Sequence, residues 1–582
     1  MSSSGVPLSI AFRNSMKRGY TRSIFRNDLT AALIVSLVAM PLAMALSIAV
    51  GLPPQHGLYT AIVAGLVVPL LGGSGMQVSG PTAAFVVIVA PIVSEHGLRG
   101  LIIATILAGL IMMAMGLAKF GRYINYVPYP VTTGFTSGIA VVIGTLALND
   151  FLGLHAGMLQ GSYLDKLQVL LAHLPTFYWP EALVGGVTLA VIFGAPRLSA
   201  RIPSPVLGIA IGTALAYYLQ QHYGITIDTI GGRFTYALPD GTLAHGIPPY
   251  PPVFHLPGLD GSALFALPSM AEIHAMLVPA LVIATLGALE SLLSATVADG
   301  IAGTKHHPNA ELVGIGIGNI LSGLVAGVPA TGAIARTAAN IHSGAKTPLA
   351  ASMHALFIMA YVLLLAPYLS YIPMAALAAL LLHVAYRMSH WRQFLRTMQI
   401  APRADIIVLV ACFGFTVFID MVAGVTVGVV LACFLLVQRV AVLTHADISH
   451  GPNQRHHKIK ALDLPDDTLV YHINGALFFA TVEKALDRAM FIQGHINTLV
   501  LDMEAVPLID MSGLVAMKTL ILDMHRKGMR VIMCGPSSVL YKILQKLPAE
   551  IAGIVTAVES LDQAATLARE AHAAKSASAR DV

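Results

Sequence analysis

Two segments of this chain combine apolar side chains with the small residues that bring a backbone close to a ligand. They are residues 78–85 (Val-Ser-Gly-Pro-Thr-Ala-Ala-Phe) and 327–333 (Gly-Val-Pro-Ala-Thr-Gly-Ala). Helices beginning at Thr82–Ala84 and Thr331–Ala333 would offer free backbone N–H groups and the positive ends of helix dipoles. A matched pair of short, interrupted segments predicts an anion site where the two ends meet. The alternative is that glycine and proline only kink packed helices.

Two charged side chains fall inside apolar stretches. Glu290 lies in the run Ala-Thr-Leu-Gly-Ala-Leu-Glu-Ser-Leu-Leu, and Arg336 lies one turn into the second short segment. Ionisable residues within a span are costly and indicate a functional site. Glu290 could carry a proton, or bind a cation when ionised, and Arg336 could attract an anion. The alternative is a structural Glu290–Arg336 ion pair, which could also open when substrate arrives.

Other polar residues predict no reaction chemistry. The pairs His306-His307 and His456-His457 lack companion ligands at convincing spacing, so we expect no metal site. GxSxG, Walker and HExxH motifs are absent from the sequence, so we expect neither an enzyme nor a cofactor.

The composition places most of the chain in a membrane. Of 582 residues, 56% are hydrophobic and only 11% are charged, whereas soluble domains average about 25% charged residues. The net charge of +5 is typical of basic cytoplasmic loops and does not indicate nucleic acid as a partner. Three cysteines are too few for a disulfide framework.

The hydrophobic stretches predict fourteen membrane segments, an even number that places both termini on one side. They cover residues 30–50, 57–72, 80–94 (short), 97–117, 130–149, 181–196, 204–220, 272–297, 311–327, 331–343 (short), 348–367, 373–387, 405–420 and 421–438. With the N-terminus inside, the long outward loops 150–180 and 221–271 carry only Lys166 and Arg233 as cations, and the inward loops are basic. This asymmetry predicts a cytoplasmic N-terminus.

Seven segments followed by seven require an inverted repeat. Pro128 follows Pro81 by 47 residues and Pro373 follows Pro329 by 44; Leu42 and Glu290 each precede their proline, Pro81 or Pro329, by 39 residues. Leu42 and Glu290 are therefore predicted pseudo-symmetric partners. The domains would be a cytoplasmic tail (1–27), a membrane domain (28–440, with repeats at about 28–220 and 272–440) and a cytoplasmic domain (441–582).

The C-terminal residues alternate between strand and helix patterns, which predicts a small α/β domain. Expected strands cover 469–473, 498–503 and 530–534, and expected helices cover 481–492, 512–527, 537–546 and 560–574. Asp510 or Ser512 would cap the helix that follows the second of these strands.

Four motifs carry a family resemblance. Residues 51–59 (Gly-Leu-Pro-Pro-Gln-His-Gly-Leu-Tyr), 78–82, 334–340 (Ile-Ala-Arg-Thr-Ala-Ala-Asn) and 510–514 (Asp-Met-Ser-Gly-Leu) resemble those of SulP anion transporters with a C-terminal STAS domain. Runs at 40–46, 79–87 and 300–306 resemble the bacterial C4-dicarboxylate transporters of this family.

The resemblance implies a core of segments 1–4 and 8–11 that moves like an elevator against a gate of segments 5–7 and 12–14. It also implies a homodimer in the bacterial inner membrane, with the STAS domain in the cytoplasm, where it could bind a regulatory protein. Substrate would lie between segments 3 and 10. The corresponding site residues are Leu42, Thr82, Ala83, Ala84, Phe85, Glu290, Thr331, Gly332, Ala333, Ala335 and Arg336.

Three residues of this chain, compared with the residues that SulP relatives have at the same positions, refine the expected function. Many relatives have Gln where this chain has Leu42, which weakens the case for sulfate. Relatives with Glu at the position of Glu290 are often proton-coupled, whereas the bicarbonate carriers have Asp there and use sodium. Related STAS domains are phosphorylated at the serine matching Ser512, which makes Ser512 a candidate for modification.

We therefore expect a proton-coupled importer of C4-dicarboxylates such as succinate, fumarate or aspartate, with Glu290 as the protonation site. Alternatives are a sulfate or bicarbonate transporter of the same fold, an uncoupled anion channel, and a membrane scaffold whose STAS domain recruits partners.

Overall fold

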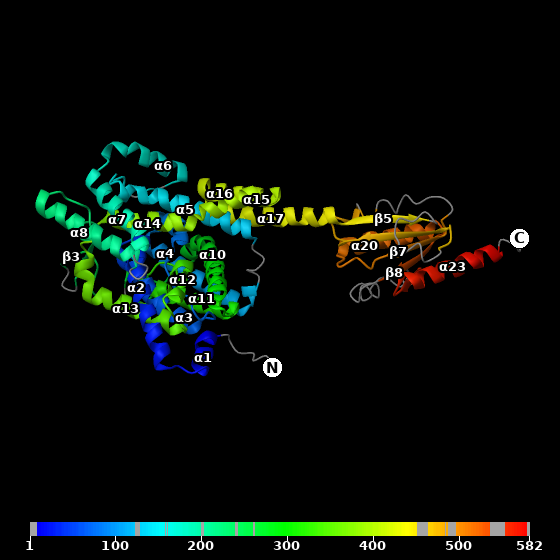
Figure 1. The fold of residues 1–582 in the computed structure, drawn as a ribbon, viewed down its shortest axis with the longest axis horizontal. Helices are drawn as coiled ribbons and strands as arrows, with labels where there is room; N and C mark the ends of the chain where they lie inside the picture. The colour runs from blue at the N-terminus through cyan, green and yellow to red at the C-terminus, as the bar shows by residue number, and fades with distance from the viewer. Residues whose placement is uncertain are drawn as a thin grey trace. The chain divides into compact units, whose positions relative to one another are not determined.

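The computed structural model describes residues 8–122, 128–157, 159, 161–198, 203–238, 242–259, 262–450, 464–483, 485–486, 496–535 and 553–578. The chain divides into two compact units, Met1–Val429 and Val430–Val582. Figure 1 shows a helical first unit and a second unit built around a sheet.

The helices up to Leu443 include the predicted membrane segments. They are α1 (Ile10–Lys17), α2 (Arg22–Ala49), α3 (Pro54–Leu71), α4 (Val86–Leu117), α5 (Tyr129–Phe151), α6 (Tyr163–Ala172), α7 (Trp179–Leu198), α8 (Ser204–Tyr223), α9 (Ile230–Arg233), α10 (Met270–Ala302), α11 (Pro308–Leu324), α12 (Ile334–His342), α13 (Pro348–Leu369), α14 (Met374–Ser389), α15 (Trp391–Ile400), α16 (Arg403–Phe418) and α17 (Met421–Leu443). Eight helices of the described chain are long and apolar enough to cross a membrane.

Helix α4 supplies two of the predicted segments. Gly97 has φ 63°, outside the helical range, and divides the helix into two arms. A positive φ is a conformation that glycine adopts at little cost. The arms correspond to the segments predicted at 80–94 and 97–117, and the chain is a polytopic helical membrane protein as expected.

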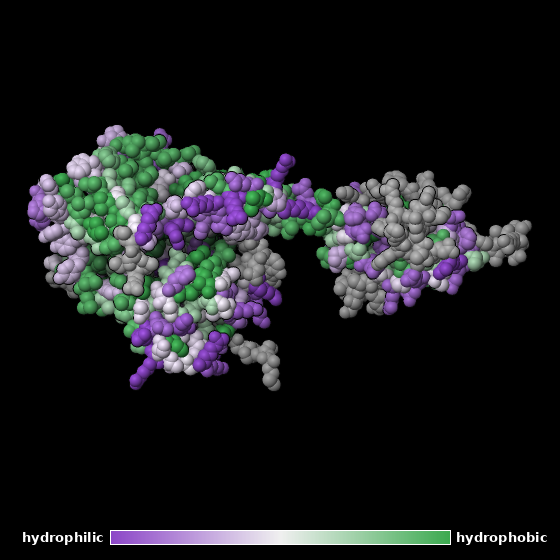
Figure 2. Space-filling model, in the orientation of Figure 1, coloured by the Kyte–Doolittle hydropathy of each residue, from purple (hydrophilic) through white to green (hydrophobic). Residues whose placement is uncertain are grey.

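The membrane helices form the two expected groups. In the core, α10 and α11 pack on α4, and α13 packs on α2 and α3. In the gate, α5 packs on α14 and α16, and α7 packs on α8 and α14. The two groups meet chiefly where α14 lies against α2. Figure 2 shows hydrophilic residues around α1 and along α15, and hydrophobic residues over much of the remaining visible surface of this unit. Exposed side chains such as Val278, Leu364 and Tyr368 suit contact with lipid.

Four helices of the first unit are not predicted spans. Helix α1 precedes the first span, α6 and α9 lie in the two long loops predicted to face outward, and α15 lies between α14 and α16. The second of these loops also forms a hairpin of β2 (Thr235–Ala237) and β3 (Leu243–His245). These segments are too short to span a bilayer.

The second unit contains a five-stranded sheet in the order β5-β6-β7-β8-β9. Strand β5 (His445–His450) runs antiparallel to β6 (Thr468–Asn474), and β7 (Thr498–Asp502), β8 (Arg530–Cys534) and β9 (Val555–Val558) continue in parallel. One face packs on α20 (Met511–Arg526) and the other on α23 (Leu561–Ser578).

Three strands and two helices of the second unit confirm the predicted α/β order. Strands β5 and β9 were not predicted. Both are edge strands, and charged or small residues there weaken the hydrophobic signal. The helix predicted at 537–546 and most of the one predicted at 481–492 lie outside the described residues.

Candidate anion-binding site

The two small-residue segments meet in the middle of the membrane unit. Residues Ser79–Gly80 form strand β1 and Thr331–Gly332 form strand β4, and the two pair in antiparallel register, Ser79 with Gly332 and Gly80 with Thr331. The backbone N–H of Ala333 also donates to the carbonyl oxygen of Val78 at 2.9 Å. The first short helix therefore starts beside the second, although they belong to opposite halves of the chain.

The helices begin directly after this pairing. On the first side Thr82 is extended, Ala83–Phe85 form a 3-10 turn, and α4 follows from Val86. On the second side Ala333 is extended and α12 begins at Ile334. The expectation of a helix start at Thr331–Ala333 was therefore slightly wrong, because Thr331 and Gly332 use their backbones to pair with β1.

Strand β4 is fixed to α10 by a chain of hydroxyl groups. Thr331 donates from Oγ1 to the carbonyl oxygen of Gly287 at 3.0 Å, and its Oγ1 lies 2.7 Å from Oγ of Ser291. Ser291 Oγ in turn accepts the backbone N–H of Gly332 at 3.1 Å. Since Thr331 is fully buried and its hydrogen is already donated, its side chain holds the backbone and offers no donor to a ligand.

Glu290 lies across from the first helix start. Thr82 donates from Oγ1 to Oε2 of Glu290 at 2.9 Å. Glu290 remains partly exposed, one residue before the fully buried Ser291. The carboxyl group is thus held at the junction by a hydrogen bond to one of its oxygens, while part of the side chain remains exposed.

Arg336 is buried at the same junction, with a relative exposure of 2%. Its Nη2 donates to the carbonyl oxygen of Pro81, and its Nε and Nη1 have no hydrogen-bond partner in the described part of the chain. Buried guanidinium N–H groups without partners are costly and suit an oxyanion.

Gly80 makes room for this guanidinium group. It has φ +153°, and a Cβ atom at this position would lie 2.8 Å from Nη1 of Arg336. Only a residue without a side chain at position 80, in the first segment, leaves space for the guanidinium group of Arg336, in the second segment.

Glu290 and Arg336 do not form the ion pair that the structural alternative requires. Among the described residues, no carboxylate oxygen lies within 4.0 Å of an Arg336 nitrogen. Glu290 is instead held by the hydroxyl of Thr82, and Arg336 by the carbonyl of Pro81. An acid and a cation are therefore both available to a ligand.

The remaining expected site residues surround this junction unequally. Leu42 in α2 is partly exposed, Ala335 is exposed, and Ala83, Ala84, Gly332 and Ala333 are buried. Phe85 is buried near Gly287, where a Cβ atom would lie 3.2 Å from its Cζ. Ser512 belongs to the second unit, where it is exposed in the first turn of α20. It follows the cap in which Asp510 accepts the N–H of Gly513 at 2.8 Å.

Another acid near the junction, Glu311, is buried and was missed from the sequence. Its Oε2 accepts the backbone N–H groups of Gly73 and Ser74, each at 2.8 Å, and its Oε1 accepts Nε2 of Gln77 at 2.8 Å. It holds the loop that leads into β1 and so positions the junction. Its position at the start of an apolar segment was the available signal.

Comparison with known proteins decides the family. The profile of the sulfate permease family matches residues 25–412, about two thirds of the chain, and that of the STAS domain matches residues 460–563. The chain belongs to the sulfate permease (SulP) family. It is 35% identical to the putative sulfate transporter YvdB of Bacillus subtilis (strain 168), over 91% of this chain and 95% of that one.

Two other similar proteins share less sequence identity with this chain. The bicarbonate transporter BicA of Picosynechococcus sp. (strain ATCC 27264 / PCC 7002 / PR-6) is 27% identical over 90% of each chain. The structure of murine Slc26a9, an anion transporter in the inward-facing state, superposes with a TM-score of 0.83 at 18% identity, over 98% of this chain and 96% of that one, which shows the shared fold. This protein is thus an anion transporter of the SulP family with a C-terminal STAS domain.

Proposed function

We propose that this SulP protein imports small dicarboxylates such as succinate, fumarate or aspartate together with protons. The observation that carries the proposal is the unpaired arrangement of Glu290 and Arg336 around one pair of helix starts. The guanidinium group and the backbone N–H groups would bind a carboxylate, and Glu290 would carry the proton.

The coupling follows from charge. An ionised Glu290 beside the site would repel an incoming anion, whereas a protonated Glu290 would not. Substrate and proton would therefore be bound together and released together. The hydrogen bond from Thr82, which begins the first helix, ties the charge of this acid to the geometry of the anion site.

The movement would be of the elevator type, with the core helices sliding against the gate helices. The junction of β1 and β4 lies wholly within the core, so it would move as one body. We also propose a homodimer in the bacterial inner membrane, with a cytoplasmic STAS domain that binds a regulatory protein.

A second candidate substrate class is sulfate or bicarbonate. It is supported by the names of the relatives, a putative sulfate transporter and a bicarbonate transporter. Leu42 argues for a different substrate. Many relatives have Gln at this position, and a leucine side chain offers an oxyanion no hydrogen-bond donor.

The test is uptake of labelled succinate into proteoliposomes under an inward proton gradient, with unlabelled sulfate and bicarbonate as competitors. We expect Glu290→Gln to bind succinate but to lose the dependence of uptake on the gradient, and Glu290→Asp to retain part of it. Unchanged gradient-driven uptake by Glu290→Gln would overturn proton coupling. Currents that persist without the gradient and far exceed carrier turnover would indicate a channel.

A further inference from the structure

A large cavity lies between the core and the gate, away from the junction of β1 and β4. It has a volume of about 610 Å³ and is lined on the core side by Ala45 and Ala90 and on the gate side by Leu377 and Leu381. Ala45 follows Leu42 by one turn of α2, and Ala90 follows Phe85 by little more than one turn of α4. The cavity therefore extends toward the transport site, and the orientation predicted from the basic loops places it on the outer side.

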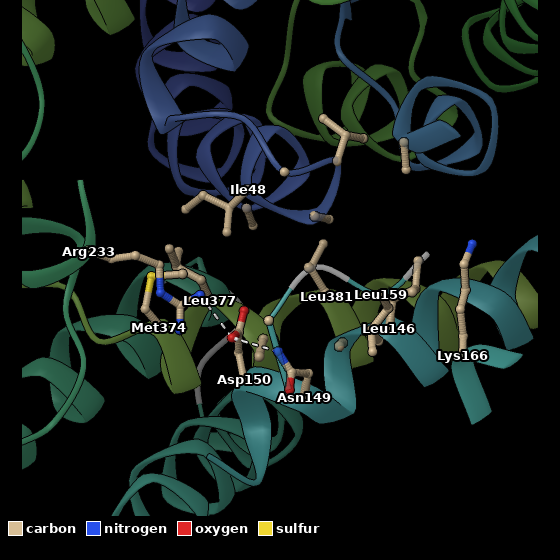
Figure 3. A pocket seen from close by; sticks show the side chains of 18 of the residues that line it. Ile48, Leu146, Asn149, Asp150, Leu159, Lys166, Arg233, Met374, Leu377 and Leu381 are labelled. Atoms are coloured by element: carbon tan, nitrogen blue, oxygen red, sulfur yellow. Dashed lines mark hydrogen bonds and ion pairs between the residues drawn. The ribbon is translucent and has the colours of Figure 1, made fainter. Parts of the chain in front are cut away.

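Both cations of the predicted outward loops line this one cavity. Lys166 and Arg233 are the only lysine or arginine residues in residues 150–180 and 221–271, and both contribute to its wall. Figure 3 shows Arg233 beside Asp150 at one side of the cavity and the ammonium group of Lys166 at the other.

The two cations differ in how they are neutralised. Arg233 donates to Oδ1 of Asp150 at 2.9 Å and also to Oδ2 of Asp228, and the charges of these acids more than offset burial and raise the pKa of Arg233. Two carboxylates pair with Arg233, so its charge is more than offset within the wall.

Lys166 has no such partner among the residues that the structure describes. Its ammonium group makes no hydrogen bond and no ion pair within the described ranges of the chain, and burial alone lowers its pKa. The third acid of the wall, Glu95, is largely exposed and lies 3.9 Å from His96. A partly buried, uncompensated cation facing a cavity attracts a small anion.

We propose that this cavity is an anion-capture site outside the transport site, in which Lys166 holds a small oxyanion before it moves to the junction. The ligand class is a carboxylate, sulfate or bicarbonate, because a lysine ammonium group recognises charge with little geometric selection. The proposal rests on anion transport by this protein and does not depend on which anion is carried.

The test measures uptake from the outer side by right-side-out proteoliposomes, with labelled succinate, sulfate and bicarbonate in parallel. For the anion that the wild-type protein carries, Lys166→Gln should raise KM about threefold to tenfold and leave Vmax unchanged, because the local concentration of the anion falls. Lys166→Arg should keep the wild-type KM. Lys305→Gln, which removes an exposed cation from the loop between α10 and α11, is the matched control and should also leave KM unchanged.

Two further readouts separate electrostatic capture from a structural role. The KM of the wild type should rise with ionic strength more steeply than that of Lys166→Gln, since salt screens exposed charges over about 8 Å at physiological ionic strength. In Lys166→Cys, aminoethyl methanethiosulfonate adds a positive charge and should restore the wild-type KM. The sulfonatoethyl reagent adds a negative charge and should not. Wild-type protein treated with the same reagents controls for reaction at Cys433, which is exposed.

A wild-type KM and salt dependence in Lys166→Gln would overturn the proposal. A lower Vmax at unchanged KM would do the same, since it would place Lys166 in folding or in the transport movement. Failure of the dicarboxylate proposal is read separately, from which labelled anion the wild type carries.

Discussion

Thr82 donates a hydrogen bond to Glu290 across 208 residues of sequence, with 2.9 Å between Oγ1 and Oε2. The donor is the last extended residue before the first helix start. The acceptor lies in α10, the helix to which β4 is hydrogen-bonded. One side-chain contact therefore joins the acid of one repeat to the candidate anion-binding backbone of the other.

Removing this contact should impair transport without unfolding the protein. Thr82→Val keeps the shape of the side chain but removes the donor, and hydrogen bonds to charged groups contribute about 1.5–3 kcal/mol. We expect the kcat/KM for uptake to fall about tenfold or more, with Thr82→Ser close to the wild type. Equal activities of the valine and serine variants would show that the hydroxyl group is not used.

The fit of Gly80 around Arg336 provides a second prediction. Gly80→Ala should displace the guanidinium group, because the new Cβ would lie 2.8 Å from Nη1 and because φ is +153°. We expect weaker binding of the transported anion, measured by calorimetry on protein in detergent. The matched control is Gly75→Ala, whose added Cβ meets no atom within 4 Å and should bind normally; equal loss in both variants would contradict this account.

Glu311 should matter for stability more than its distance from the junction suggests. Glu311→Ala leaves the N–H groups of Gly73 and Ser74 without an acceptor, and such losses cost about 1–3 kcal/mol each. The melting temperature in detergent should fall by several degrees, and less in Glu311→Gln. Glu95→Gln, at an exposed acid, should not change it, and an equal effect there would point to a general loss of charge.

The STAS unit should become less stable in acid. Burial alone would raise the pKa of Asp502, but hydrogen bonds from His472 and from the Glu504 backbone, with the charge of His472, lower it below its usual value. A carboxyl group whose pKa is lower in the folded state stabilises the fold above its unfolded pKa of about 3.9. That stabilisation is lost as pH falls through the folded value.

Hydrogen exchange of β6 and β7 in the full-length protein measures this effect. Asp502→Asn should exchange faster than the wild type near neutral pH, and the difference should shrink below about pH 4, where the wild-type carboxyl group also becomes protonated. Asp523→Asn removes a more exposed acid and should show no local change. A difference that stays constant across this pH range would contradict the role given to the carboxylate.

Much of the architecture could be predicted from local sequence. The fourteen apolar segments, the break at Gly97 and the parallel strands of the STAS unit follow from hydrophobicity, glycine and chain order. These features depend on each residue's own preference for lipid, helix or strand, so the sequence contains them directly. The equal spacing of Leu42 and Glu290 from the two prolines also pointed to the pair of segments that meet.

Contacts between distant residues were decided only by the tertiary structure. The sequence left open whether Glu290 pairs with Arg336, and the structure instead gives Glu290 to Thr82 and Arg336 to Pro81. In the structure the hydroxyl of Thr331 also donates to a backbone carbonyl group of the protein, and the carboxylate of Glu311 accepts three hydrogen bonds. The physical reason is that a polar side chain buried in the membrane unit has several possible partners, and the register of β1 on β4 selects among them.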